Sequence, residues 1–218
     1  PMIKFSYKKR TYNFYKLFKN LFDLLFSFLF LIAFLPLFLI ISFLIKLSSR
    51  GPIFFRQKRI GKNNVAFKCI KFRTMYPEAK YILENLLMKD ALLKKEFEEN
   101  HKIKNDPRIT PIGKFLRKTS LDELPQFINV LRGEMSIIGP RPIVKEEKKK
   151  YGKNLKKILL IKPGITGLWQ VSGRNNLTYK RRVALDLNYV ENYNLLMDLR
   201  ILLRTFGVIL IPLDRGAY

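Results

Sequence analysis

The sequence predicts an α/β, mostly helical fold that begins with a re-entrant membrane helix hairpin and continues as a separate domain with amphipathic interfacial helices. Three observations predict it. Residues 24–45 carry no charge. Residues 51–76 alternate short apolar runs with basic residues and turn signals, which is typical of one or two short strands. Beyond residue 78, apolar residues recur at helical spacing.

The uncharged segment is long enough to cross the apolar part of a bilayer. As a helix, residues 24–45 would extend roughly 33 Å. Pro36 lies near the middle, where it removes the hydrogen bond to the Ile32 carbonyl and kinks the helix. The segment alone therefore leaves two topologies open, a span and a bent helix that enters and leaves on one side.

The charges on both sides of this segment favour the bent form. Residues 1–20 and 46–73 contain many Lys and Arg and no acidic residue. Segments rich in Lys and Arg stay on the cytoplasmic side, so both flanks obey this rule only if the helix returns. We therefore expect a basic juxtamembrane segment over residues 1–20, a membrane helix over 21–47 and a cytosolic domain over 48–218.

Helical spacing predicts the elements of the second domain. Helices are expected over residues 78–100, 121–131, 145–160, 178–196 and 198–210. The last is apolar except for Arg200 and Arg204, which are one turn apart. This pattern suits a helix lying on a membrane surface, and equally a core helix with two exposed arginines.

The composition narrows the partners and the chemistry. The formal net charge is +25, which attracts polyanions such as nucleic acid, anionic lipid or phosphorylated small molecules. One cysteine, Cys69, excludes an internal disulfide and is expected to be a small buried hydrophobe. One Cys and one His, His101, cannot build a zinc site or a Cys–His nucleophile pair.

Two adjacent carboxylates, Asp122 and Glu123, stand where the helix over 121–131 is expected to begin. The positive end of that helix would keep both ionised. One interpretation is a capping box formed by Ser120 and Glu123, although Pro125 would then fall where the helix needs an N–H. The other interpretation is a catalytic pair, and the local sequence leaves both open.

Several arginines surround this pair in the sequence. Arg117 precedes it, and Arg141 lies between two prolines, so that its backbone has little freedom and its guanidinium suits bidentate phosphate binding. Arg174 follows a stretch rich in glycine. Carboxylates with several arginines near a membrane segment indicate a metal-assisted reaction on a phosphorylated substrate.

At this point the sequence resembles a known family, the bacterial sugar transferases or monotopic phosphoglycosyl transferases, from about Tyr12 to Tyr218. The resemblance rests on five motifs in order: Lys71-Phe72-Arg73-Thr74-Met75, Asp106-Pro107-Arg108-Ile109-Thr110, Ser120-Leu121-Asp122-Glu123-Leu124-Pro125-Gln126, Gly139-Pro140-Arg141-Pro142 and Pro163-Gly164-Ile165-Thr166-Gly167-Leu168-Trp169-Gln170. The insert at 78–104 and the segment Arg215-Gly216-Ala217-Tyr218 resemble the undecaprenyl-phosphate galactose phosphotransferase branch. The family often has Ser-Pro at the helix break, where this chain has Leu35-Pro36.

The resemblance implies a covalent mechanism. Asp122 would attack the β-phosphorus of a UDP-sugar and release UMP, and the phosphosugar would then pass to undecaprenyl (polyprenyl) phosphate. Asp122 and Glu123 would hold Mg²⁺. The residues that the resemblance implies for substrate binding are Lys71, Arg117, Arg141, Gln170 and Arg174.

The resemblance also implies a location and partners. The enzyme would contact the lipid bilayer of the bacterial inner (cytoplasmic) membrane, with its catalytic domain on the cytoplasmic face, and would initiate synthesis of a surface glycan. The sugar and a homodimer stay open. One rival function, a membrane-tethered nucleic-acid-binding module, lacks a reading motif, so nucleic acid is not an expected partner. A second rival, a non-catalytic scaffold, does not need the Asp122–Glu123 pair.

Overall fold

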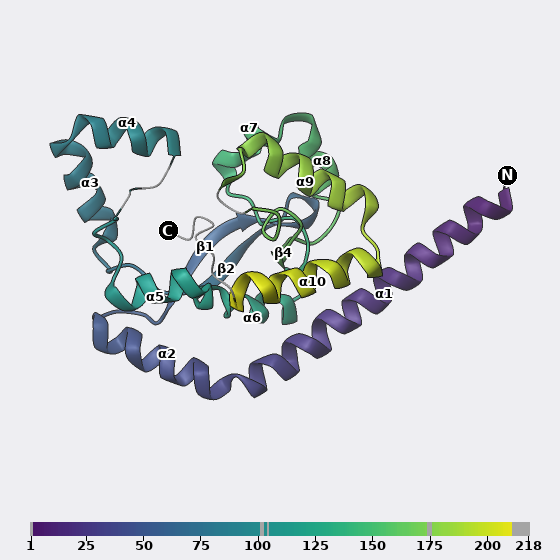
Figure 1. Ribbon diagram of the computed structural model, residues 1–218, viewed down its shortest axis with the longest axis horizontal. Coiled ribbons are helices and arrows are strands. Elements are labelled where there is room, and N and C mark those ends of the chain that lie inside the picture. The colour runs from purple at the N-terminus through teal and green to yellow at the C-terminus, as the bar shows by residue number, and fades with distance from the viewer. Residues whose placement is uncertain (1, 101–102, 104, 174–175, 211–218) are drawn as a thin grey trace. The chain divides into compact units, whose positions relative to one another are not determined.

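The computed structural model describes residues 2–100, 103, 105–173 and 176–210 (Figure 1). These residues form mostly helices with small sheets, which confirms the predicted α/β, mostly helical class. The longer helices are α1 (Met2–Ala33), α2 (Leu35–Ser48), α3 (Ala79–Lys89), α4 (Ala91–Asn100), α5 (Pro111–Thr119), α6 (Gln126–Leu131), α9 (Tyr179–Asn192) and α10 (Leu195–Leu210). The strands are β1 (Phe54–Ile60), β2 (Ala66–Phe72), β3 (Ser136–Ile138) and β4 (Gly164–Thr166).

The chain divides into two compact units. The first comprises residues 1–35, 56–70 and 125–216, and the second comprises 36–55, 71–124 and 217–218. Part of the core of the first unit is a cluster of buried apolar side chains from β1, the segment after β3, and α7 to α9: Ile60, Ile143, Tyr151, Ile158 and Val183. Part of the apolar interior of the second unit is Phe72, whose ring packs against those of Phe38 and Phe54.

A break at Phe34 separates α1 from α2, and the chain bends by 62° there. The predicted kink is confirmed, since Pro36 has no N–H to donate and its ring crowds the carbonyl of Ile32. Within the described residues, no single helix has both the length and the apolar composition of a membrane span. The stretches Phe14–Ala33 and Leu35–Ser48 reach that length and composition only as a bent pair.

The two small sheets differ in how well the sequence predicts them. β1 and β2 pair within the predicted strand region, and the connection over residues 61–65 is too short for a parallel crossover. β3 and β4 pair in parallel, with Ser136 opposite Gly164 and Ile138 opposite Thr166. The sequence did not predict this second sheet, because each of its strands is only three residues long.

Gly164 allows two segments of backbone to meet at this parallel pair. A Cβ on Gly164 would lie 2.1 Å from the Gly139 nitrogen. The Gly164 N–H donates to the Pro140 carbonyl at 2.8 Å, and the Gly139 N–H donates to the Thr166 carbonyl at 2.9 Å. The two glycine-containing motifs therefore serve first to join β3 to β4.

The predicted helices need five corrections. The helix over 178–196 ends at Asn192, because Tyr193 leaves the helical conformation (φ −59°, ψ 134°), and α10 begins at Leu195. The helix over 78–100 is two helices, because Asp90 is extended (φ −135°, ψ 105°) between α3 and α4. The helix over 121–131 is a 3₁₀ turn, η2 (Leu121–Glu123), followed by α6. The stretch over 145–160 is broken into η3 (Lys145–Glu147), α7 (Lys148–Tyr151), η4 (Gly152–Asn154) and α8 (Leu155–Ile158), with Gly152 at φ 51°. Helix α5 was missed, although Thr110 and Pro111 form a typical N-cap and first-turn pair.

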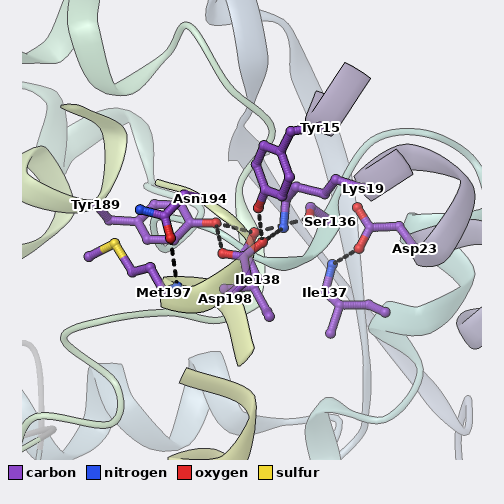
Figure 2. A network of polar contacts seen from close by, with 10 residues as sticks. All are labelled: Tyr15, Lys19, Asp23, Ser136, Ile137, Ile138, Tyr189, Asn194, Met197 and Asp198. Atoms are coloured by element: carbon purple, nitrogen blue, oxygen red, sulfur yellow. Dashed lines mark hydrogen bonds and ion pairs between the residues drawn. The ribbon is translucent and has the colours of Figure 1, made fainter. Parts of the chain in front are cut away.

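A buried polar network in the first unit joins α1 to β3, α9 and α10 (Figure 2). The Asp198 carboxylate accepts from the Tyr15 hydroxyl and the Lys19 ammonium, both at 2.5 Å, and from the Tyr189 hydroxyl at 2.7 Å. On α1, the Asp23 carboxylate accepts the Ile137 N–H at 3.1 Å. The side of α10 that carries Asp198 and Ile201 therefore points into the unit, while Arg200 and Arg204 are exposed together with several apolar side chains: Leu195, Leu196, Leu199, Leu203 and Phe206.

Asn129 on α6 is fully buried and satisfies three partners in the first unit. Its side-chain oxygen accepts the Ile70 N–H at 2.9 Å. Its amide nitrogen donates to the Lys68 carbonyl at 2.8 Å and to the Glu134 carboxylate at 2.6 Å. One side chain thus holds α6 against β2 and against the turn that leads into β3.

Replacing Asn129 with Leu should lower the free energy of unfolding by about 2–4 kcal/mol, because buried polar partners lose their hydrogen bonds. Chemical denaturation of the purified protein in detergent measures this change. The exposed Asn188→Leu on α9 is the control and should change stability by less than about 0.5 kcal/mol. Equal effects of the two substitutions would contradict the role given to Asn129.

Candidate active site

The carboxylate pair lies in the turn between α5 and α6, in the part of the chain that belongs to the second unit. Ser120 ends α5 in the left-handed conformation, with φ 60°. Its side chain makes no capping hydrogen bond, and only its backbone carbonyl accepts the Glu123 N–H, at 3.2 Å. The capping-box interpretation of Ser120 and Glu123 is therefore wrong.

Lys71 at the end of β2 contacts both carboxylates. Its ammonium lies 2.5 Å from Glu123 Oε1 and 3.9 Å from Asp122 Oδ2. The Asp122 side chain is the more buried of the two carboxylates, at 13% exposed against 30% for Glu123. The structure thus brings together three of the residues that the sequence singled out.

The buried position of Asp122 controls its ionisation. Burial raises the pKa of Asp122 to about 6, with Glu123 acting in the same direction and Lys71 and Arg117 opposing it. The sequence predicted that a helix N-terminus would favour the ionised form. The cause given for ionisation was wrong, because η2 is only three residues long. Burial makes the ionised form of Asp122 less favourable, and this effect outweighs that of the nearby positive charges. Asp122 is still mostly ionised at pH 7, but as a weakly solvated carboxylate.

Arg117 is a second cationic residue near Asp122 in the second unit. Its Nε donates to Thr74 Oγ1 at 2.9 Å. Burial lowers the pKa of Arg117, while the carboxylates of Asp122 and Asp106 oppose that shift. Asp106 is itself held by three hydrogen bonds from the Arg108 guanidinium, at 2.8, 3.1 and 2.7 Å. The Arg117 guanidinium is therefore fixed in position close to the carboxylate pair.

The backbone of Thr74 packs closely against the N-terminal part of α5. The Thr110 N–H donates to the Thr74 carbonyl at 3.0 Å, and Thr110 Oγ1 caps α5 by accepting the Gly113 N–H at 3.0 Å. A Cβ on Gly113 would lie 2.0 Å from the Thr74 oxygen. Only glycine therefore allows α5 to approach closely enough for Arg117 to reach Thr74.

Sequence reasoning did not give roles to Thr74, Asp106, Arg108 or Gly113. The first three lie in motifs that carried the family resemblance, so a signal for them was present. Their roles depend on contacts between distant segments, for example 43 residues from Thr74 to Arg117. Gly113 offered no signal, because a glycine in a helix does not show which backbone it meets.

The other predicted substrate-binding residues belong to the first unit or lie outside the described residues. The Arg141 guanidinium lies 5.6 Å from the centre of the Trp169 ring. The Gln170 amide nitrogen donates to the Ile165 carbonyl at 3.2 Å, and its buried Oε1 has no hydrogen-bond partner in the described part of the chain. Arg174, His101 and residues 215–218 lie outside the described residues. Cys69 is buried, as predicted.

The two carboxylates fit a magnesium ion that is bound mainly through its substrate. Among the described residues, no group of three or more His, Cys, Asp and Glu side chains could hold a metal ion. Mg²⁺ usually keeps several waters and binds through one or two carboxylates and substrate phosphates. Asp122 and Glu123 supply that number of carboxylates, so the donor set suits Mg²⁺ better than zinc.

Replacing Lys71 with Met should reduce turnover by about 10²-fold, because the ammonium offsets charge on the carboxylates and would offset charge on a phosphorylated substrate. Loss of that charge should also raise the pKa of Asp122 further. Steady-state kinetics measures the loss. Lys68→Met is the matched control, since Lys68 lies on the same strand with an exposed side chain. An unchanged rate in Lys71→Met would contradict this role.

Comparison with known proteins identifies the family of this chain. The family model described as bacterial sugar transferase matches residues 14–212. The chain is 48% identical over 171 residues to a UDP-galactose-lipid carrier transferase of Erwinia amylovora, covering 78% of this chain and 36% of that protein. It is 49% identical over 160 residues to an undecaprenyl-phosphate galactose phosphotransferase of Salmonella typhimurium, covering 73% and 34%.

The relatives differ in length. The two enzymes above are matched over about a third of their own length. The exopolysaccharide production protein ExoY of Rhizobium meliloti is 45% identical over 179 residues, which cover 82% of this chain and 78% of that protein. In every case the match covers most of this chain. The family match and these identities show that the chain belongs to the bacterial sugar transferase family.

Proposed function

We propose that this protein transfers a sugar-1-phosphate from a UDP-sugar to undecaprenyl (polyprenyl) phosphate, releases UMP, and so initiates synthesis of a surface glycan. The observation that carries the proposal is the buried Asp122 carboxylate with Lys71 and Arg117 beside it. Relatives named for undecaprenyl phosphate, for a lipid carrier and for exopolysaccharide production support the substrate class.

In the first step, an Asp122 carboxylate oxygen attacks the β-phosphorus of the UDP-sugar. A bond forms between Asp122 and this phosphorus, and the bond from phosphorus to the bridging oxygen breaks. The electron pair of that bond leaves with UMP. A carboxylate in a poorly solvated site is a better nucleophile than one in water, and fixed cations at Lys71 and Arg117 stabilise charge on the phosphoryl oxygens.

In the second step, an oxygen of the polyprenyl phosphate attacks the phosphorus of the aspartyl phosphosugar. The new phosphorus–oxygen bond forms as the bond to Asp122 breaks, so the carboxylate is restored and a lipid-linked diphosphosugar is released. Dividing the transfer in this way lets one set of cations serve two similar displacements. When bound, Mg²⁺ would supply further positive charge for the phosphate oxygens, and Asp122 and Glu123 would hold it.

A lipid substrate requires access to a membrane, and we propose that α1 and α2 form the re-entrant hairpin. Apolar side chains on both helices are more than half exposed, among them Leu29, Ile32, Leu39 and Phe43. Such exposure is unfavourable in water and favourable in lipid. The bend near Pro36 and the basic residues on both flanks support entry and exit on the cytoplasmic side of the inner membrane. The exposed apolar residues of α10 support a helix that lies at the interface.

The hairpin can be tested by chemical labelling. A cysteine at Ser6, in a Cys69→Ser background, should resist a membrane-impermeant thiol reagent in intact cells and react after lysis. Pro36→Ala should straighten the helix and move some molecules to a spanning form, which exposes that cysteine. Labelling of the parent protein in intact cells would contradict the hairpin.

A panel of UDP-sugars tests the proposed reaction. With polyprenyl phosphate in detergent, the protein should release UMP from at least one member, with UDP-galactose the first candidate because two relatives are named for galactose. Product lipid should appear in equal amount. Release of UDP in place of UMP would contradict transfer of a sugar-1-phosphate.

A further inference from the structure

The Trp169 ring lies close to two guanidinium groups in the first unit. The Arg182 guanidinium carbon is 5.0 Å from the ring centre, and that of Arg141 is 5.6 Å away. Trp169 is buried, while both arginines are half-buried. Cation–π attraction holds each guanidinium against the ring. Residues from the β3 end, the β4 end and α9 are thereby gathered into one cluster, the Arg141–Trp169–Arg182 cluster.

The Arg182 side chain and the backbone on both sides of Arg141 are held by contacts away from the ring. Arg182 Nε donates to the Leu177 carbonyl at 3.1 Å. The backbone around Arg141 is held on both sides, because the Pro140 carbonyl accepts the Gly164 N–H at 2.8 Å and the Pro142 carbonyl accepts an Arg59 N–H at 3.1 Å. The Arg182 guanidinium and the backbone that carries Arg141 are therefore held in place.

Holding two like charges this close has a cost. Burial lowers the pKa of Arg182, and the Arg141 charge lowers it further. The Glu147 carboxylate acts in the opposite direction on Arg182 and offsets part of this cost. Asp186 lies near Arg141, but burial raises its pKa to about 8, which limits the charge it offers there. An anion that contacts both guanidiniums would reduce this repulsion.

The edge of the ring provides a third, independent sign of a ligand. The Trp169 Nε1–H is buried and has no hydrogen-bond partner among the residues that the structure describes. A buried donor without a partner is costly, and such groups usually meet water or a ligand. The donor and the two cations belong to one cluster, and both kinds of group prefer an oxyanion.

We propose that Arg141, Trp169 and Arg182 form a binding site for one phosphate group, in which Arg182 is a substrate-binding residue. Guanidinium groups match phosphate oxygens in geometry and charge, and the indole N–H adds a neutral donor. The inference rests on the proposed function in one respect, since that function supplies two phosphate sources, the UDP-sugar and the polyprenyl phosphate. The UDP-sugar and the polyprenyl phosphate would each present a phosphate group to the same three side chains.

Binding can be measured without turnover, because Trp169 is the one tryptophan of the 218 residues. Inorganic phosphate, UMP and detergent micelles containing polyprenyl phosphate are titrated separately while Trp169 fluorescence is recorded. A saturable change is expected with at least one of them. Arg182→Gln should weaken that binding at least about 10-fold, and Arg182→Lys should weaken it less.

Arg181→Gln is the matched control, because it removes the same charge from an exposed position of the same helix. It should leave the titration unchanged. Circular dichroism spectra and melting temperatures show whether the variants are folded. If Arg182→Gln does not fold, Arg182→Lys decides the matter. A Trp169 signal that no phosphate compound changes, or that changes equally in a folded Arg182 variant and in the wild type, overturns the proposal.

The source of the phosphate follows from the two half-reactions. If the site takes the donor, Arg182→Gln slows UMP release in the absence of acceptor. If it takes the acceptor, UMP release is normal and transfer to the lipid is slowed. Failure of the proposed function would show as absence of UMP release in the wild type, and the fluorescence titration would still decide whether the site binds phosphate.

Discussion

Asp122→Asn should abolish turnover, with a loss of about 10⁴-fold or more, because the amide cannot form the covalent phosphosugar intermediate. The substitution keeps the shape of the side chain, so the fold and its burial should be retained. UMP release should fall to background both in the presence and in the absence of acceptor. Turnover close to that of the wild type would exclude Asp122 as the nucleophile.

The same substitution should stabilise the metal-free protein. Burial raises the pKa of Asp122 from 3.8 to about 6, so ionisation is less favourable in the folded state than in the unfolded chain. The cost of ionising Asp122 is absent below about pH 4, grows as the pH rises to about 6, and is constant above it. Above about pH 6, the cost of ionising Asp122 is about 3 kcal/mol. Asp122→Asn should therefore raise the melting temperature at pH 7.5 and change it little at pH 4.

A control separates this effect from a general loss of charge. Glu84→Gln removes a carboxylate that is 56% exposed on α3, so its melting temperature should follow the wild type across the same pH range. A lower melting temperature for Asp122→Asn at pH 7.5 would mean that the carboxylate stabilises the fold. Replacing a catalytic residue is expected to raise stability while it abolishes activity.

Removal of divalent cations should stop the reaction, and this is the second large effect. The fixed positive groups near Asp122 are Lys71 and Arg117, while the donor brings two phosphates whose charge increases as UMP leaves. EDTA should reduce UMP release to background, and Mg²⁺ should restore it. Full activity in excess chelator would contradict the requirement for a metal.

Glu123→Gln refines the metal prediction. If Glu123 helps to hold Mg²⁺, this variant should need at least about 10-fold more Mg²⁺ for half-maximal rate. Glu84→Gln is the control, since Glu84 is 56% exposed and its close ionic contact is with Lys80 on the same helix. Equal Mg²⁺ requirements for Glu123→Gln and the wild type would show that Glu123 has another role.

The sequence could predict the features that depend on residues close to one another in the chain. Asp122 and Glu123 are adjacent, and the kink at Pro36 follows from the chemistry of one residue. The strand region over 51–76 was visible in its alternation. The capping box failed because Ser120 adopts a left-handed conformation, which depends on how α5 ends rather than on the motif around Ser120.

The parts that the sequence could not predict depend on contacts between distant segments. The pairing of Lys71 with Glu123 joins residues 52 apart, and that of Lys19 with Asp198 joins residues 179 apart. Asp198 looked like the start of an apolar helix, although it is the buried acceptor for Tyr15, Lys19 and Tyr189. The need for glycine at position 113 likewise appears only when Thr74 is in place.

The central claim is that Asp122 carries the phosphosugar, and intact-protein mass spectrometry tests it most directly. The protein is mixed with its UDP-sugar and Mg²⁺ in the absence of polyprenyl phosphate and then quenched in acid. We predict a mass increase of one phosphosugar, located on the peptide that contains Asp122, together with one equivalent of UMP. Adding polyprenyl phosphate should remove the adduct. A wild-type enzyme that turns over with acceptor, but forms neither adduct nor UMP without it, would contradict the covalent mechanism.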